Sequence, residues 1–161
     1  MKPTKLAATA VLAISAITIS PGAMSASIVN SGPAGAKVKD LASKKFRSSL
    51  YGYVQGYRDG SNRYVRIMFS NGTRTDYAMA AGITCKAPNG TILASNEFKV
   101  AKLGWSNGGA VERQKLFKVD CPAPNTLEVK FDEPRGDLLT SLEWQNVLLK
   151  LAAVYAGTIT F

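Results

Sequence analysis

The chain has 161 residues, is 46% hydrophobic and carries a formal net charge of +9, with no histidine. Histidine supplies the base of Ser-His-Asp and Cys-His catalytic centres and is a common metal ligand, so the sequence excludes the enzymes and metal sites that depend on it. The apolar content and the lack of long low-complexity segments indicate a folded domain rather than a disordered chain.

Residues 1–26 have the pattern of a secretory signal peptide. Two lysines precede an uncharged apolar run over residues 6–19, and small residues follow it. The run breaks at Pro21 after about 14 residues, whereas a membrane-spanning helix needs about 20, so we expect cleavage rather than an anchor. We therefore predict an exported protein, secreted or periplasmic, whose net charge falls to +7 when Lys2 and Lys5 are removed.

Residues 27–45 predict a flexible basic arm in front of the domain. They are rich in Ser, Gly, Ala and Lys and contain the breaker Pro33-Ala34-Gly35. Their lysines outnumber the single acid, Asp40, so the arm is a candidate for holding an acidic partner, and a solvated leader is the other interpretation. A short helix over Val38–Phe46 is the alternative local structure.

From Leu50 onward, apolar and polar residues alternate and turn residues recur at regular intervals, which is typical of an antiparallel all-β domain. The expected strands are Leu50–Tyr57, Arg63–Ser70, Arg74–Cys85, Phe98–Gly104, Val111–Cys121 and Leu127–Phe131. The turn signals between them include Asp59-Gly60, Asn71-Gly72 and Asn89-Gly90, and Asn-Gly in particular predicts a hairpin. We therefore predict one β-rich domain over residues 46–161.

Alternation within the strands also assigns their faces. The predicted core residues share the inward faces and are Val65, Ile67, Phe69, Phe117, Val119, Val129 and Phe131. Cys85 and Cys121 lie on apolar faces near strand ends, and in an oxidising compartment two such thiols predict a disulfide between strands. Short strands, Gly and Asn turns and one internal bridge predict an antiparallel β-sandwich of immunoglobulin-like or jelly-roll type.

The last segment, Leu138–Phe161, combines two patterns. Apolar residues first recur at helical spacing, behind a capping-box pattern of Thr140 and Glu143. Residues from Val154 then alternate as in a strand. We predict a helix within Leu138–Ala153, with a strand as the alternative there, followed by a closing strand over Val154–Phe161.

Carboxylates are the remaining candidates for acid or base catalysis. Asp132, Glu133 and Asp137 cluster around Pro134, but neighbouring acids in a polar turn are usually solvated, whereas a glycosidase holds two carboxylates across a sugar. The turn also lacks the ligand spacing of a calcium loop. We therefore predict a non-enzyme with no catalytic residue, no bound metal and no cofactor.

Arg135-Gly136-Asp137 spells the tripeptide by which extracellular adhesive proteins bind integrins. Three residues often match by chance, and a turn by itself explains Gly136. The motif therefore predicts no function.

Aromatic and guanidinium side chains concentrate on the first two expected hairpins. The residues predicted to bind a partner are Tyr51, Tyr53, Tyr57, Arg58, Arg63, Tyr64, Arg66 and Arg74. Such groups stack on planar ligands and pair with anions, so the expected partner is an anionic glycan, a lipid or an acidic protein. Packing of the tyrosines in the core is the competing interpretation. Nucleic acid is not an expected partner, because the protein is exported and carries no recognisable nucleic-acid module.

These observations favour an exported, non-enzymatic β-sandwich that binds an acidic surface component or a partner protein. One alternative is a small outer-membrane β-barrel, since hydrophobic residues alternate up to Phe161, although charges on both faces of Val111–Lys118 count against it. The other alternative is a histidine-free secreted hydrolase, for which the sequence shows no catalytic arrangement. We expect a protein that does not span a membrane.

Overall fold

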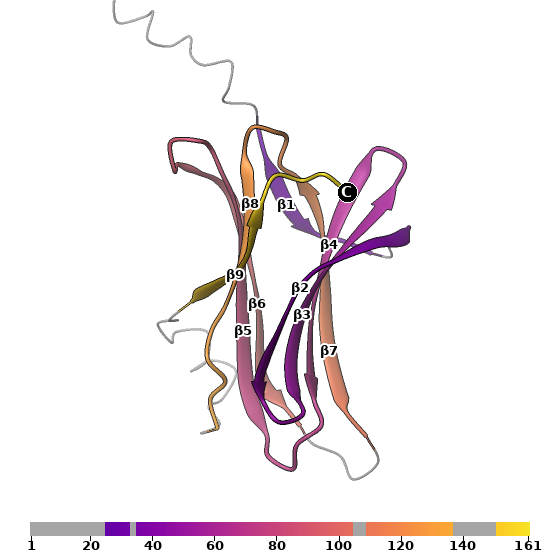
Figure 1. Cartoon of the computed structure of the whole chain (residues 1–161), viewed down its shortest axis with the longest axis vertical. Helices are drawn as coiled ribbons and strands as arrows, with labels where there is room; N and C mark the ends of the chain where they lie inside the picture. Colours follow the sequence, from indigo (N-terminus) through magenta and orange to yellow (C-terminus); the bar gives the residue numbers. More distant parts are fainter. Residues whose placement is uncertain (1–24, 33–34, 105–108, 137–150) are drawn as a thin grey trace, which may run out of the picture.

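The computed structural model describes residues 25–32, 35–104, 109–136 and 151–161, which form strands and no helix (Figure 1). In chain order the strands are β1 (Ser27–Asn30), β2 (Ala36–Arg47), β3 (Leu50–Asp59), β4 (Asn62–Asn71), β5 (Tyr77–Lys86), β6 (Ile92–Leu103), β7 (Val111–Asp120), β8 (Thr126–Phe131) and β9 (Ala152–Gly157). The predicted all-β class is confirmed. This described part of the chain contains no apolar helix of the length needed to cross a membrane.

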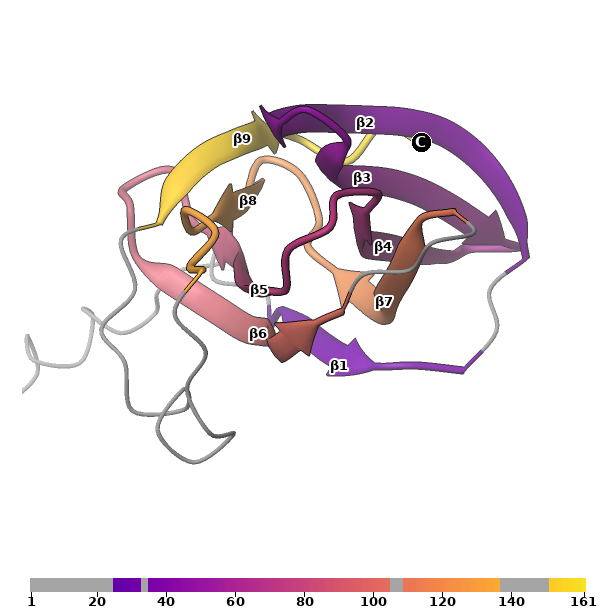
Figure 2. The same cartoon turned by 90° about the horizontal axis from the view of Figure 1, so that it is seen from below.

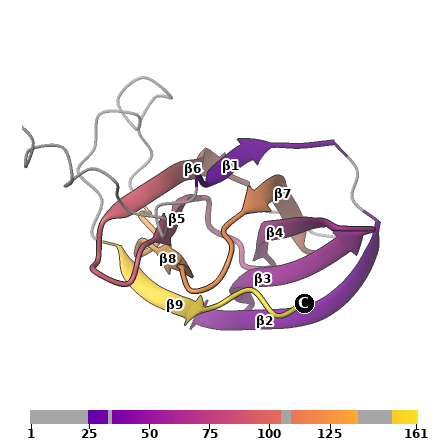
Figure 3. The same cartoon turned by 90° about the horizontal axis from the view of Figure 1, so that it is seen from above.

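Hydrogen bonding sorts the strands into two antiparallel sheets. The five-stranded sheet has the order β1-β7-β4-β3-β2, and the four-stranded sheet has the order β6-β5-β8-β9. Viewed along the strands, the sheets face each other, with β9 beside β2 at one side and β1 beside β6 at the other (Figures 2 and 3). This arrangement is the predicted antiparallel β-sandwich.

The core lies between the two sheets and is built from every second residue of their strands. On β3, for example, Leu50 and Val54 are fully buried because alternate side chains point inwards. All seven predicted core residues are at most 4% exposed. The rings of Phe69 and Phe131 meet edge to face with centroids 5.4 Å apart, which joins β4 of one sheet to β8 of the other.

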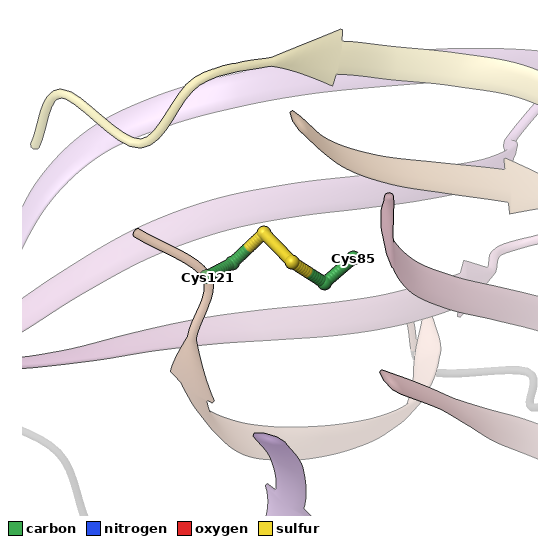
Figure 4. Close-up of a disulfide and its surroundings, with 2 residues drawn as sticks. All are labelled: Cys85 and Cys121. Atoms are coloured by element: carbon green, nitrogen blue, oxygen red, sulfur yellow. A yellow bond between two sulfur atoms is a disulfide. The ribbon is translucent and has the colours of Figure 1, made fainter. Parts of the chain in front are cut away.

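The predicted disulfide joins Cys85, near the end of β5, to Cys121, directly after β7 (Figure 4). The two Cα atoms are 5.7 Å apart, and both side chains are buried. Because β5 and β7 belong to different sheets, the bridge ties the two layers of the sandwich together. A structural disulfide also indicates an oxidising compartment.

Two of the expected hairpins are present and one is not. β3 and β4 pair across Gly60, and β5 and β6 pair across Gly90; both glycines have a positive φ. Asn71-Gly72 instead leads from β4 in one sheet to β5 in the other. The expected hairpin is wrong because the strands on either side of Asn71-Gly72 belong to different sheets; Asn71 is fully buried, and its amide donates to the carbonyl of Leu103 at the end of β6.

The expectation of a flexible arm over residues 27–45 is corrected, as is the alternative helix over Val38–Phe46. β1 pairs with β7, and β2 pairs with β3 along its length, so these residues belong to the five-stranded sheet. Three register shifts against β3 each insert one extra residue into β2: Val38, Leu41 and Phe46. These bulges interrupt the alternation that would have marked β2 as a strand in the sequence.

The predicted closing strand is present as β9, which pairs with β8. It begins at Ala152 rather than Val154 and ends at Gly157. The helix expected within Leu138–Ala153 lies mostly outside the described residues, which omit 137–150, and its last two positions, Ala152 and Ala153, belong to β9 instead. Most of the expected signal peptide, residues 1–24, also lies outside the described residues.

Candidate functional site

The outward side of the five-stranded sheet gathers aromatic, amide and charged side chains in rows across β2, β3, β4 and β7. We term this surface the tyrosine face; its residues are Lys37, Asp40, Ser43, Lys45, Tyr51, Tyr53, Gln55, Tyr57, Tyr64, Arg66, Met68, Ser70, Glu112, Gln114, Leu116 and Lys118. Tyr51, Tyr53 and Tyr57 are partly exposed, whereas the residues between them on the inward side are buried. The interpretation that these tyrosines pack in the core is therefore wrong.

Arg66 is the centre of a hydrogen-bond network that crosses four strands. Its Nε donates to Oε1 of Gln55 at 2.8 Å, and its Nη1 donates to Oε1 of Gln114 at 2.9 Å. Gln55 donates from Nε2 to Oδ1 of Asp40 at 2.9 Å, and Lys37 forms an ion pair with that carboxylate at 3.0 Å. The network therefore depends on the register of β2, β3, β4 and β7 together.

Tyrosine rings border this network along β3. Tyr53 and Tyr57 flank Gln55 on the outward side, because they lie two positions before and after it. Tyr51 stacks on Tyr53 with ring centroids 5.9 Å apart, and the guanidinium of Arg66 lies 5.3 Å from the ring centroid of Tyr57. These contacts hold several planar groups in fixed positions on one surface.

The tyrosine face carries more positive than negative side chains. Its cations are Lys37, Lys45, Arg66 and Lys118, and its carboxylates are Asp40 and Glu112. Arg66 is held by neutral amide oxygens, so no contacting carboxylate cancels its charge. Over the described part of the chain, no carboxylate forms an ion pair with Lys45 or Lys118. The local excess of positive charge attracts anions.

Asp40 remains ionised within this surface. Two hydrogen bonds lower the pKa of Asp40 below its ordinary value of 3.8: the one from Lys37 has the larger effect, and the one from Gln55 has the next largest. An ionised carboxylate only accepts hydrogen bonds, so Asp40 is an acceptor for donors such as hydroxyl groups.

The structure brings together only part of the predicted binding set. Tyr51, Tyr53, Tyr57 and Arg66 meet on the tyrosine face. Tyr64 belongs to the same face but is only 8% exposed, because it lies between Tyr57 and the neighbouring strand β7. Tyr64 therefore supports the surface more than it offers contact area.

The three remaining arginines of the predicted set lie elsewhere. Arg58 pairs with Arg63 in the β3–β4 hairpin, two residues from the pair Gly56 and Val65. Both arginines therefore lie on the same side of the sheet as Gly56 and Val65, which is the inward side. Arg74 is exposed in the connection after β4, beyond the opposite end of that strand from Arg63. The expectation that all eight residues form one patch is wrong, because alternation places Arg58 and Arg63 on the other side of the sheet and Arg74 lies beyond the end of β4.

Several residues of the tyrosine face were placed elsewhere or missed by the sequence analysis. Lys37 and Asp40 were assigned to a flexible basic arm, and the residues missed as binding residues are Gln55, Gln114 and Lys118. Gln55 could have been found, because it shares the alternation of its neighbouring tyrosines. Gln114 could not, since it is 48 positions away from Arg66 and meets it only through the pairing of β4 with β7.

The carboxylates considered for catalysis are held in separate ion pairs. Asp132 is buried and contacts Arg135 at 3.3 Å, while Glu133 contacts Lys44 of β2 at 3.6 Å. Arg135 is the first residue of the integrin-type tripeptide, and its backbone also pairs with Ala78, so it is fastened to the sandwich. Asp137 lies outside the described residues. Within the described ranges, no three His, Cys, Asp or Glu side chains group as a metal site.

No known family, curated protein or solved structure matches this chain. The chemistry of the tyrosine face is therefore the basis for assigning a function.

Proposed function

We propose that the chain is an exported, non-enzymatic β-sandwich that binds an acidic partner on the tyrosine face. Arg66 is the observation that carries this proposal. Of the five N–H donors of a guanidinium, the amide oxygens of Gln55 and Gln114 take three, which leaves two for a ligand. A guanidinium held in advance by neutral groups keeps its charge and loses little rotamer entropy when it binds a carboxylate or phosphate.

The surroundings of Arg66 support the same function. Lys45 lies on β2 beside Tyr51, and Lys118 lies on β7 beside Tyr64, so the two lysines occupy opposite corners of the face. An extended acidic ligand that crosses Arg66 diagonally would meet both of them. Attraction of this kind speeds encounter and is weakened by salt.

Export is supported by two independent features. Residues 1–26 have the charge and apolar pattern of a signal peptide. Cys85 and Cys121 form a buried disulfide, as expected in a secreted or periplasmic protein. The acidic partner is therefore a component met outside the cytoplasm.

Two triple variants test where the acidic partner binds. Each removes three positive charges, one variant on the tyrosine face and the other outside it. The face variant changes Lys45, Arg66 and Lys118 to Ser, and the control variant changes Arg58, Arg63 and Arg74 to Ser. Affinity for immobilised polygalacturonate and polyglutamate is measured at low salt. We expect the face variant to lose about tenfold or more in affinity and the control variant to lose little.

Salt provides the second measurement. The Debye length falls from about 10 Å at 0.1 M to about 3 Å at 1 M salt, so the unchanged protein should release both polymers at high salt. Equal losses by the two variants would show that net charge alone matters and would overturn the assignment to the tyrosine face. Failure of the unchanged protein to bind either polymer at low salt would overturn the function.

A further inference from the structure

A hollow of about 350 Å³ opens at the edge of the tyrosine face, between β2 and the residues Tyr53 and Gln55 of β3. It lies where the course of β2 is irregular. Bulges at Val38 and Leu41 each add one residue to β2, so Lys37, Asp40 and Ser43 stand opposite Tyr57, Gln55 and Tyr53 although they are three positions apart in the sequence. Leu41, at the second bulge, and Ala42 also line the hollow.

We infer that this hollow holds one sugar unit of an acidic polysaccharide; the inference rests on the proposed function and names the chemical class of its partner. Its volume lies near the lower end of the range of about 300–1,000 Å³ found for small-molecule sites, which suits a single ring. The rest of the polymer would continue across the sheet towards Arg66, which lies one strand beyond Gln55.

The polar lining suits a ligand with many hydroxyl groups. A hydroxyl both donates and accepts a hydrogen bond, so a sugar site needs acceptors and donors side by side. Asp40 is an ionised acceptor, Lys37 is a donor, and the hydroxyl of Ser43 can serve as either. Nζ of Lys37 and Oδ1 of Asp40 form an ion pair at 3.0 Å, so both groups are positioned before a ligand binds.

The aromatic lining suits the apolar side of a sugar ring. Tyr53 forms part of the hollow, and its ring is held by the stack with Tyr51. An aromatic ring with a polar tip packs against C–H groups while its hydroxyl reaches a polar partner. A site that only attracts anions does not need an aromatic ring, whereas a carbohydrate site uses the ring to pack against the C–H groups of the sugar.

An acidic peptide fits this place less well. An extended peptide would add a strand to the outer edge of β2, but the bulges in its pairing with β3 bend and twist that strand, and Lys39 and Lys44 lie along it. Asp40 repels the carboxylates of an acidic peptide and of an acidic sugar alike, but only the sugar also has hydroxyl groups that donate to Asp40.

Three small probes of matched length test the inference on the mature protein: a galacturonate trisaccharide, a glutamate tripeptide and neutral maltotriose. Binding is measured by titration calorimetry at low salt. We expect the acidic trisaccharide to bind at least about tenfold more tightly than either of the other probes, because only it offers both the hydroxyl groups and the acid groups.

Substitution of Asp40 separates carbohydrate recognition from simple charge attraction. Asp40→Asn removes a negative charge, so pure attraction predicts tighter binding of every anionic probe. Asparagine keeps one acceptor oxygen but has a donating NH2 group in place of the other, so loss of that acceptor instead predicts weaker binding of the trisaccharide, by about tenfold. Asp76→Asn is the matched control, because Asp76 pairs with Lys102 outside the tyrosine face.

Substitution of Tyr53 tests the stacking surface. We expect Tyr53→Ala to lose about tenfold in affinity for the trisaccharide and Tyr53→Phe, which keeps the ring, to retain most of it. Equal binding of the tripeptide and the trisaccharide would overturn the sugar site while leaving the proposed function intact. If maltotriose bound as tightly as the acidic trisaccharide, the requirement for acid groups would be overturned. If the protein bound neither the small probes nor the polymers, both proposals would be overturned.

Discussion

Gly52 lies on the inward side of β3 and leaves room for the ring of Phe131. A β-carbon at this position would lie 2.5 Å from Cε2 of that ring. The ring contacts Phe69 and Phe46, with centroids 5.4 and 5.8 Å away, which limits its movement. We predict that Gly52→Ala lowers the free energy of unfolding by about 1–3 kcal/mol, measured by urea denaturation, because the core becomes overpacked.

A second substitution checks this cause. Phe131→Leu destabilises the protein by itself but removes the ring that a side chain at position 52 would strike. The double variant Gly52→Ala with Phe131→Leu should therefore lose less stability than the sum of the two single losses. Strict additivity would show that the cost at Gly52 comes from elsewhere.

At the scale of elements, two identical tripeptides have different structural roles. Asn89 begins the Asn-Gly-Thr sequence of the exposed β5–β6 hairpin, where its Oδ1 accepts a hydrogen bond from the Thr91 amide. Asn71 begins the other copy, which carries the chain from one sheet to the other. Its side chain is fully buried and donates to the carbonyls of Thr75 at 2.8 Å and Leu103 at 3.0 Å. Asn71 therefore fastens the crossing to the end of β6.

We predict unequal effects of the same substitution in these two connections. Asn71→Ala should cost about 2–4 kcal/mol of unfolding free energy, because it removes several hydrogen bonds and leaves buried carbonyl groups without a partner. Asn89→Ala should cost less than about 1 kcal/mol, since water replaces its exposed hydrogen bond. Thermal and urea denaturation measure both. Similar losses in the two variants would contradict the role assigned to Asn71.

For the whole molecule, the Cys85–Cys121 disulfide adds a covalent cross-link between the sheets. It closes a loop between residues 36 positions apart. By the loop-entropy estimate, replacing both cysteines with Ala should lower the free energy of unfolding by about 4 kcal/mol. Reduction of the unchanged protein should reproduce the loss measured for the double variant. A change below about 1 kcal/mol in both experiments would show that packing alone holds the sheets together.

The order of residues is sufficient to predict the parts of the molecule in which alternation is unbroken. Ile67 and Phe117 could be assigned to the core, and Cys85 and Cys121 to facing strand ends. Buried and exposed side chains alternate along a strand, and this alternation is visible in the sequence. The all-β class and the sandwich followed from the same pattern. The same alternation puts Tyr51, Tyr53 and Tyr57 on one side of β3. It does not say whether that side faces the core or the solvent, and only the pairing of β3 within the sheet shows that it faces outwards.

Which strands neighbour each other, and where alternation fails, depends on how the whole chain packs. Bulges in β2 obscured its pattern, and the two Asn-Gly turns look alike until one of them proves to cross between the sheets. The network around Arg66 joins Gln55 to Gln114 through strands that are distant in sequence. Register between such strands is set by the packing of the whole core, so a single stretch of sequence carries too little information to place those side chains together.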